Sequence, residues 1–323
     1  MAHSNLNTVI IKEFKKLARQ IKLDINNKLN IINSFRLQSI LKIINILEKF
    51  PEKITNNNLN QLKNISGIGN NTIARIKEIL NTGKLSEIKQ DIEFIDELEK
   101  VFGIGHKTAS NLIKNYNIKS IKELKDLVKN KKIDLPQNIV KGLKYYGKIK
   151  DNIPRNEIDS INNYIQEILR KIDPELFGII CGSYRRLKLT SNDIDILIIH
   201  PRTNYLKEIV NYLIKEKFII ESFTDNNNNN NNNTKYMGLC QYNNNPIRRI
   251  DIRFIPYESY YYAMLYFTGS KDFNKKMRMV AVNMGYLLNE YGLYKNNKLF
   301  KANSEKEIFD YLNLEYVDPQ FRN

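Results

Sequence analysis

The sequence predicts an α+β protein of several domains, with a wholly helical N-terminal part followed by a small mixed or antiparallel sheet that helical and mixed segments flank. Apolar residues recur at helical spacing through the first third, as in "FRLQSILKIINILEKF", and Pro51 ends that helix. From about residue 177 the apolar period changes to two, which is typical of strands. A length of 323 residues is enough for two or three domains.

Composition favours a polyanionic partner. The formal net charge is +16, and a surplus of that size indicates nucleic acid before membrane. Cys181 and Cys240 lack metal-ligand spacing, which argues against a zinc site or a disulfide framework. No apolar run approaches about 20 residues and the first residues lack a secretory signal pattern, so we expect an intracellular protein that is neither secreted nor bound to a membrane.

Two related segments form an internal repeat in the helical part. They read "LKNISGIGNNTIARIKEIL" and "LEKVFGIGHKTASNLIKNY", and each sets a G-I-G tripeptide between two helical patterns. A helix that starts directly after such a turn aims unpaired backbone N–H groups at one point, where an anion binds. Gly67 and Gly69 in the first copy, and Gly103 and Gly105 in the second, would let a phosphate backbone come close. A plain tight turn is the alternative.

Two strand-like segments carry carboxylates where apolar residues are expected. In "DIDILII", Asp193 and Asp195 point to the same face, with α-carbons roughly 7 Å apart. In "RRIDIRFI", Asp251 faces away from the isoleucines beside it. Three like charges that converge across a sheet need a cation, and Mg²⁺ prefers such oxygens. The alternative is three exposed aspartates on an open face.

The segment before these carboxylates, "CGSYRR", predicts a strand that turns through Gly182 and Ser183 into the start of a helix. Backbone N–H groups and a hydroxyl would then lie beside the carboxylates. Arg185 and Arg186 follow, and an arginine fork suits a triphosphate. Metal, phosphate site and cation together predict nucleotidyl transfer with two ions roughly 4 Å apart.

The order of these motifs resembles the family X DNA polymerases, in particular their polymerase beta-like members. "CGSYRR", "DIDIL", "RRIDIR" and "YFTGSKDFNKKMR" follow two glycine hairpins, and the resemblance runs from about Phe35 to Tyr311. It implies that both hairpins are helix-hairpin-helix motifs and that the sheet is a nucleotidyltransferase palm. The implied domains are a DNA-end-binding, lyase-like domain (1–90), a helical DNA-binding subdomain (91–151), the palm (152–258) and a nucleotide-binding subdomain (259–323).

The resemblance also implies the metal sites. Asp193 and Asp195 would bind two Mg²⁺ ions, for which Mn²⁺ could substitute, and Asp251 would complete the catalytic site and accept the proton of the primer 3′-hydroxyl. Hairpin carbonyls would hold a monovalent cation, Na⁺ or K⁺. The carbonyls are those of Lys63, Ile65 and Ile68 in the first hairpin and of Glu99, Val101 and Ile104 in the second.

Nucleotide and DNA contacts are implied in the same way. Tyr266 and Phe267 would lie against the sugar, and a cis peptide is expected between Gly269 and Ser270. Arg253 would take part in a switch that couples closure to assembly of the metal site. The full nucleotide-binding set is Gly182, Ser183, Arg186, Ser191, Asn192, Tyr266, Phe267, Gly269, Lys271 and Asn274. The DNA-binding set is Gly67, Gly69, Gly103, Gly105, Lys107, Lys235, Arg249, Arg253, Arg278 and Tyr291, in which Arg278 reaches the minor groove with Asn274.

Several positions depart from the family pattern. Asn152 and Lys271 replace an arginine and an aspartate near the nucleotide, and Leu187 and Asn192 replace glycines. We expect the backbone of Asn192 to present the same N–H as the glycine, because Asn tolerates positive φ better than other non-glycine residues do.

The lyase position also departs from the family. Arg75 stands where lyase-active members have a Schiff-base lysine, and guanidinium does not become a nucleophile. An assisting tyrosine is absent as well, with Ile40 or Leu41 in its place. Lys77, Lys42 and Lys84 are the remaining candidates, and the sequence leaves the lyase reaction open.

The leading hypothesis is a DNA polymerase that fills short gaps in base excision repair. The expected partners are gapped or nicked duplex DNA, deoxynucleoside triphosphates, a DNA ligase and other repair enzymes. We expect a monomer in the nucleus or at a cytoplasmic site of DNA replication. A template-independent nucleotidyltransferase and a non-catalytic DNA-end-binding protein are the alternatives. The asparagine run 226–233 predicts a disordered loop between two strands.

Overall fold

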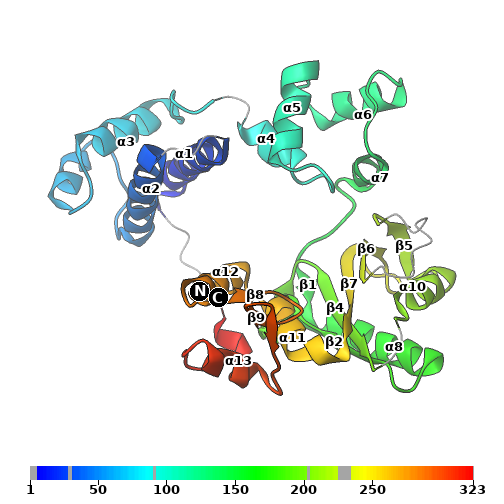
Figure 1. The fold of residues 1–323 in the computed structure, drawn as a ribbon. Coiled ribbons are helices and arrows are strands. Elements are labelled where there is room, and N and C mark those ends of the chain that lie inside the picture. The colour runs from blue at the N-terminus through cyan, green and yellow to red at the C-terminus, as the bar shows by residue number, and fades with distance from the viewer. Residues whose placement is uncertain (1–5, 28–30, 90–91, 202–203, 225–233, 323) are drawn as a thin grey trace. The chain divides into compact units, whose positions relative to one another are not determined.

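The computed structural model describes residues 6–27, 31–89, 92–201, 204–224 and 234–322, with the backbone alone at 25–27 and 31–33. The asparagine run lies outside the described residues. The chain divides into two compact units, Met1–Lys132 and Ile133–Asn323, each of which is described by itself (Figure 1). The four domains inferred from the sequence stay a prediction.

The first unit is wholly helical where it is described, as the sequence predicts. Amphipathic spacing buries one face of each helix, and Phe14, Leu17, Leu47, Leu62 and Ile76 are completely enclosed in its core. The second helix ends two residues before Pro51, which cannot continue it. The elements are α1 (Thr8–Asn27), α2 (Ile31–Lys49), η1 (Leu59–Asn64), α3 (Asn70–Thr82), α4 (Ile92–Leu98), α5 (His106–Tyr116) and α6 (Ile121–Lys129).

The second unit contains a five-stranded sheet in the order β2-β4-β7-β6-β5. Strands β4 and β7 are parallel, and the other neighbours are antiparallel, so the sheet is mixed as expected. The five strands are β2 (Phe177–Ile180), β4 (Ile194–His200), β5 (Ile219–Ser222), β6 (Lys235–Cys240) and β7 (Arg248–Pro256).

Alternation along the strands gives the sheet two different faces. One face, with Ile196 and Ile252, packs against α8 (Arg155–Ile172) and α10 (Leu206–Lys215). The other, with Leu197 and Ile255, packs against α11 (Tyr260–Thr268). Asp195 and Asp251 belong by alternation to this second face, so α11 is the helix that closes the space in front of them.

The C-terminal part of this unit has a core of its own around Tyr262, Leu293 and Phe309. Helices α11 and α12 meet at the turn formed by Thr268, Gly269 and Ser270, which we call the turn wall. The remaining elements are α7 (Gln137–Tyr145), β1 (Ile153–Pro154), α9 (Gly182–Arg185), β3 (Thr190–Ser191), η2 (Tyr257–Ser259), α12 (Lys271–Asn283), β8 (Leu287–Leu288), β9 (Leu293–Lys295), β10 (Lys298–Phe300), α13 (Glu305–Tyr311) and η3 (Pro319–Phe321).

Candidate active site

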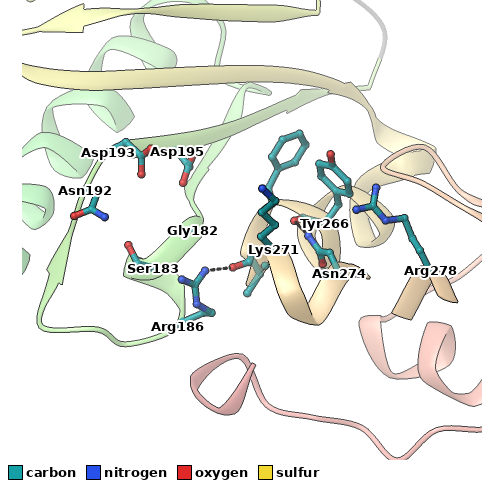
Figure 2. A pocket seen from close by; sticks show the side chains of 13 residues that line it. Gly182, Ser183, Arg186, Asn192, Asp193, Asp195, Tyr266, Lys271, Asn274 and Arg278 are labelled. Atoms are coloured by element: carbon teal, nitrogen blue, oxygen red, sulfur yellow. Dashed lines mark hydrogen bonds between the residues drawn. The ribbon is translucent and has the colours of Figure 1, made fainter. Parts of the chain in front are cut away.

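Three carboxylates converge at one end of the parallel pair. The register of β4 and β7 sets Asp195 directly beside Asp251, and Asp193 stands two residues earlier, between β3 and β4. The residues that alternate with them, Ile194 and Ile250, are completely buried on the opposite face. Figure 2 shows the side chains of Asp193 and Asp195 next to each other. The predicted convergence of these carboxylates is therefore present.

Electrostatics favour a cation at this place. Burial, together with the charges of Asp193 and Asp251, raises the pKa of Asp195 to about 7. Burial and the charge of Asp193 raise the pKa of Asp251 to about 6. Arg249 approaches the group at its edge, with Nη2 3.8 Å from Asp193 Oδ2. Because negative charge dominates and all the donors are carboxylate oxygens, these residues fit a divalent ion.

A glycine brings helix α9 close against the carboxylates. Gly182 has φ +56°, and a Cβ added there would lie 2.2 Å from Asp195 Oδ2. Glycine is therefore required on two grounds, the left-handed backbone and the contact. Ser183 follows and lines the cavity in front of the carboxylates. The predicted strand, turn and helix start at "CGSYRR" are confirmed.

The cavity has a volume of about 350 Å³ and is open to solvent. In Figure 2 the carboxylates and Ser183 lie on one side, and residues of α11 and α12 lie on the other. Thr268 belongs to this lining, although the sequence did not single it out. The lining residues are Gly182, Ser183, Arg186, Asn192, Asp193, Asp195, Tyr266, Phe267, Thr268, Gly269, Lys271, Asn274 and Arg278.

The α11–α12 side is organised around Tyr266. Asn274 Nδ2 donates a hydrogen bond to the carbonyl of Tyr266 at 2.6 Å, and the Arg278 guanidinium lies 5.7 Å from the Tyr266 ring. Arg253 lies in the same way over Phe267, 5.5 Å from its ring centre. The expected cis peptide between Gly269 and Ser270 is present. The residues predicted to meet a sugar and a base pair thus share one wall.

Of the neighbouring arginines Arg185 and Arg186, Arg186 is the one that lines the cavity. Its Nη1 donates to the carbonyl of Thr268 at 2.5 Å, while its buried Nε has no hydrogen-bond partner among the described residues. Burial lowers the pKa of Arg186, which the charges of Asp195 and Asp193 oppose. A cation that is partly desolvated and not fully hydrogen-bonded suits an anionic ligand such as a triphosphate.

The expected arginine fork is wrong for Arg185. Its guanidinium points away from the cavity and pairs with Glu305 and the hydroxyl of Thr268. Neighbouring residues on a helix differ by about 100° in direction, so Arg185 and Arg186 cannot both face one ligand.

Other predicted residues lie outside this lining. The hydroxyl of Ser191 is buried without a hydrogen-bond partner in the described part of the chain. Asp251 and Arg253 line a small adjoining pocket together with Asp195 and Phe267. Lys235 is exposed and pairs in register with Arg253, whereas the carbonyl of Tyr291 accepts from Ser259. Their roles stay predictions.

Two glycine replacements behave differently from each other. Leu187 keeps a left-handed backbone with φ +58°, which a glycine would adopt without strain. Asn192, in contrast, does not have a positive φ, and the expectation that its backbone N–H takes the place of the glycine's stays a prediction. Asn152 does adopt a left-handed conformation, with φ +59°.

The two glycine hairpins of the first unit share one backbone design. Gly67 and Gly103 have φ of +103° and +86°, and Gly69 and Gly105 are the extended residues that precede α3 and α5. All four are exposed, whereas the isoleucine between each pair is buried. Lys107, in the first turn of α5, is also exposed. The N–H groups of both helix starts are thus accessible to an anion.

Carbonyls predicted to hold a cation lie at the same turns. The carbonyl of Ile65 accepts from the N–H of Ile68 at 3.0 Å, and that of Val101 accepts from Ile104 at 3.1 Å. Each carbonyl has a second lone pair that this bond does not use. The cation sites stay a prediction.

Arg75 is held by acidic Glu87. Its Nη2 lies 3.2 Å from Glu87 Oε2, and Arg36 Nη2 lies 2.8 Å from the same oxygen. Among the candidate lysines, Lys42 lies closest to a hairpin, because a Cβ on Gly67 would be 3.5 Å from its Nζ. Lys77 and Lys84 are exposed.

A further group of potential ligands lies at the other end of β4. Single ligand atoms of Asp173, Glu175 and His200 lie within 4.8 Å of one another. None of the three lines the cavity, and the sequence did not single them out. Within the described ranges, no helix combines the length and apolarity needed to cross a bilayer.

Comparisons with known proteins agree with this arrangement. Family models match for the DNA polymerase beta palm (152–257), the DNA polymerase beta thumb (263–323) and a helix-hairpin-helix domain (5–85). The chain is 31% identical over 314 residues to DNA polymerase lambda of Arabidopsis thaliana, covering 88% of this chain and 57% of that protein.

Two further relatives are similar over nearly the whole chain. DNA polymerase lambda of Rattus norvegicus is 28% identical over 335 residues, covering 95% of this chain and 57% of that protein. DNA nucleotidylexotransferase of Xenopus laevis is 27% identical over 334 residues, covering 90% of this chain and 64% of that protein. The chain therefore spans less than two thirds of the length of these relatives.

Proposed function

Since the chain belongs to the family X DNA polymerases and is polymerase beta-like, we propose that it is a DNA-directed DNA polymerase that fills short gaps. The observation that carries the proposal is the meeting of Asp193, Asp195 and Asp251 in front of a cavity with a partly desolvated arginine. In this proposal a deoxynucleoside monophosphate joins the primer 3′-hydroxyl, and pyrophosphate leaves.

Each wall of the cavity has its own task in the reaction. Asp193 and Asp195 would hold both divalent ions and Asp251 one of them, and the ions supply charge stabilisation at the attacking and leaving oxygens. Asp251 accepts the proton of the 3′-hydroxyl, directly or through water. Ser183 and Arg186 bind the β- and γ-phosphates, because a hydroxyl and a guanidinium donate to phosphate oxygens.

Recognition of DNA would fall mainly to the backbone. The hairpins at Gly67–Gly69 and Gly103–Gly105 would bind phosphates of a gapped or nicked duplex, with Na⁺ or K⁺ at their carbonyls. The charge of +16 supports this role. Asn274 and Arg278 line the cavity near Tyr266, where a new base pair would form, and this favours a templated reaction.

The template-independent alternative gains support from the Xenopus relative, whose name describes a nucleotidylexotransferase. Extension of a primer on a one-nucleotide gap, compared with extension of the same primer as a single strand, separates the two. Incorporation on the gap that follows the template base supports the proposal. Equal, untemplated extension of the single strand would overturn it.

A repair role would require the processing of strand ends. The 5′-deoxyribose phosphate lyase reaction needs a neutral amine, which Arg75 does not offer. Lys42 lies beside Gly67 and is therefore the first lysine to substitute. Borohydride trapping on a gap with a 5′-deoxyribose phosphate end decides whether the reaction occurs, and its loss in Lys42→Ala would identify the amine. Action in base excision repair with a DNA ligase belongs to the same proposal.

A further inference from the structure

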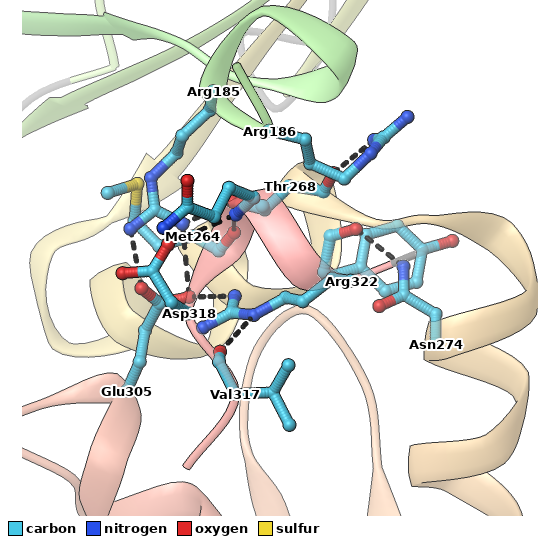
Figure 3. A network of polar contacts seen from close by, with 11 residues as sticks. Arg185, Arg186, Met264, Thr268, Asn274, Glu305, Val317, Asp318 and Arg322 are labelled. Carbon is cyan, nitrogen blue, oxygen red and sulfur yellow. Dashed lines mark hydrogen bonds and ion pairs between the residues drawn. The ribbon is translucent and has the colours of Figure 1, made fainter. Parts of the chain in front are cut away.

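One cation of the cavity lining is not engaged by the rest of the described chain. The lining carries the cationic side chains of Arg186, Lys271 and Arg278. Arg186 Nη1 donates to the carbonyl of Thr268, a contact that Figure 3 shows, and Arg278 lies over the ring of Tyr266. Among the same described residues, the ammonium of Lys271 makes no hydrogen bond and pairs with no carboxylate. Lys271 can therefore give its whole charge to a ligand.

The position of Lys271 is unfavourable for a cation as long as no anion is bound. Lys271 is the first residue of α12 and directly follows the turn wall. The start of a helix carries a partial positive charge, so a lysine there is disfavoured. A Cβ added at Gly269 would lie 3.1 Å from Arg186 Nη1 and 3.5 Å from the backbone N of Lys271, so a second cation borders the same point. Lys271 is also exposed, so packing does not compensate for the repulsion.

The direction of the side chain indicates which part of a nucleotide it meets. Figure 2 shows Lys271 extending from the start of α12 into the space between Tyr266 and Asp195. Ser183 and Arg186, for which phosphate contacts are proposed above, line the same cavity. An ammonium is a compact, strongly hydrated charge on a flexible stem, and it pairs with anionic oxygens. The expected contact is therefore a phosphate group and not the neutral base.

We propose that Lys271 determines nucleotide affinity by binding the triphosphate of the incoming nucleotide together with Arg186. This inference rests on the proposed polymerase function. The family pattern has an aspartate at this position and an arginine at Asn152, so this chain has gained a cation at the first position and lost one at the second. Asn152 does not line the cavity. The start of α12 thus supplies positive charge to the triphosphate.

The test is single-nucleotide insertion by Lys271→Gln on one-nucleotide gapped DNA. We expect the KM for the deoxynucleoside triphosphate to rise about fivefold whatever the templating base, with kcat changed much less, because a charge-assisted contact is lost from the ground state and the transition state alike. Lys271→Arg keeps the charge, so its KM should stay within about twofold of the wild-type value. Added salt should reduce the difference between Lys271→Gln and the wild type, because exposed charges are screened.

Thermal unfolding separates this role from a structural one. Removal of a cation from a helix start should leave the unfolding temperature unchanged or raise it slightly, so Lys271→Gln should bind nucleotide less well without a loss of stability. Lys276→Gln is the matched control, because Lys276 is an exposed lysine of the same helix that lies outside the cavity lining. The control should leave KM unchanged.

Inorganic tripolyphosphate identifies the part of the nucleotide that Lys271 contacts. It contains the phosphates without sugar or base, so its inhibition of insertion should weaken in Lys271→Gln by the same factor as the nucleotide affinity does. A rise in KM that depends on the base, with unchanged inhibition by tripolyphosphate, would place Lys271 against the base and overturn the inference.

Three further results would also overturn the inference. The first is an unchanged KM for Lys271→Gln. The second is a rise in KM together with a lower unfolding temperature, which would make the residue structural. The third is an equal rise for Lys276→Gln, which would trace the effect to the loss of any positive charge. A wild-type chain that inserts no nucleotide on gapped DNA would instead refute the proposed function, so the two failures are distinguishable.

Discussion

Two charged clusters on opposite sides of the cavity differ in how their charges are compensated. The carboxylate cluster, Asp193, Asp195 and Asp251, brings like charges together, with arginines only at its edges. In the arginine network, Arg185 and Arg322 enclose Glu305, and both oxygens of that carboxylate accept hydrogen bonds. Burying like charges costs folding free energy, whereas a paired and hydrogen-bonded group is compensated.

The pKa values show the same contrast. Burial and neighbouring negative charge raise the pKa of Asp195 to about 7, which disfavours its charged form. Burial alone would lower the pKa of Arg185, but its hydrogen bonds to Glu305 and the charge of that residue raise it above the ordinary value. The first cluster is therefore suited to an added cation, whereas in the second the carboxylate of Glu305 is already neutralised by two guanidinium groups. The carboxylate cluster thus has the properties of a ligand site, and the arginine network has those of a structural support.

The largest effect is expected for Asp251→Asn in the carboxylate cluster. Removal of a metal ligand and proton acceptor should lower insertion by more than about 1000-fold, which corresponds to about 4 kcal/mol. The affinity for gapped DNA should stay nearly intact, because the hairpins are elsewhere. Single-turnover insertion and a DNA titration measure the two effects. Near-normal insertion would remove Asp251 from the mechanism.

The complementary change, in the arginine network, is Glu305→Gln. It leaves the buried guanidinium of Arg322 and the half-buried one of Arg185 without their carboxylate, so the free energy of unfolding should fall by about 3 kcal/mol. Urea unfolding measures this change, with exposed Glu315→Gln as the control from the same segment. A loss below 1 kcal/mol for Glu305→Gln would show that the network contributes no more than a surface pair.

Tyr266→Ala tests a residue that lines the cavity but belongs to neither cluster. Its ring is proposed to crowd the 2′ position of the sugar, so its removal should favour ribonucleotide insertion by roughly tenfold, or about 1.4 kcal/mol. The ratio of kcat/KM for the two sugars measures discrimination. An unchanged ratio would assign the task to the backbone or to Phe267.

The smallest effect is expected outside both clusters, at Gly105. Its φ of −96° suits any residue and a Cβ there would meet nothing within 4 Å, so Gly105→Leu should fold normally. The affinity for gapped DNA should fall about fivefold whatever the DNA sequence, because one or two phosphate contacts are lost. Gly103→Leu, at φ +86°, should instead lower the unfolding temperature. A loss that depended on base sequence would contradict backbone recognition.

Local pattern was sufficient to predict the carboxylate cluster. Strand alternation fixes the faces of Asp193, Asp195 and Asp251, and glycine spacing fixes the hairpins, because both depend on neighbours in the sequence. The mixed sheet and the cis peptide also agree with the sequence-based expectations.

The arginine network depends on distant residues. Arg185 meets Glu305 across 120 positions, and no local periodicity encodes that pairing. For the same reason the ligand role predicted for Arg185 is wrong, because its side chain pairs with Glu305. Leu187 and Asn192 show a further limit, since the backbone angle at each depends on the turn around it and not on residue type alone.

If the carboxylate cluster is arranged for a divalent ion, its charges destabilise the folded chain when metal is absent, and thermal unfolding at pH 8 tests this. The raised pKa of Asp195, about 7, means that the folded chain binds its proton more tightly than the unfolded chain does. Without metal, stability should therefore fall as pH rises from about 4 to about 7 and stay low above that range.

At pH 8, Asp195→Asn should unfold roughly 5 °C higher than the wild-type chain without metal, because the charge that is costly to bury is gone. Added Mg²⁺ should raise the unfolding temperature of the wild type and leave that of Asp195→Asn nearly unchanged. If Asp195→Asn instead unfolds lower without metal, or gains as much from Mg²⁺ as the wild type, the carboxylates are not arranged for a divalent ion.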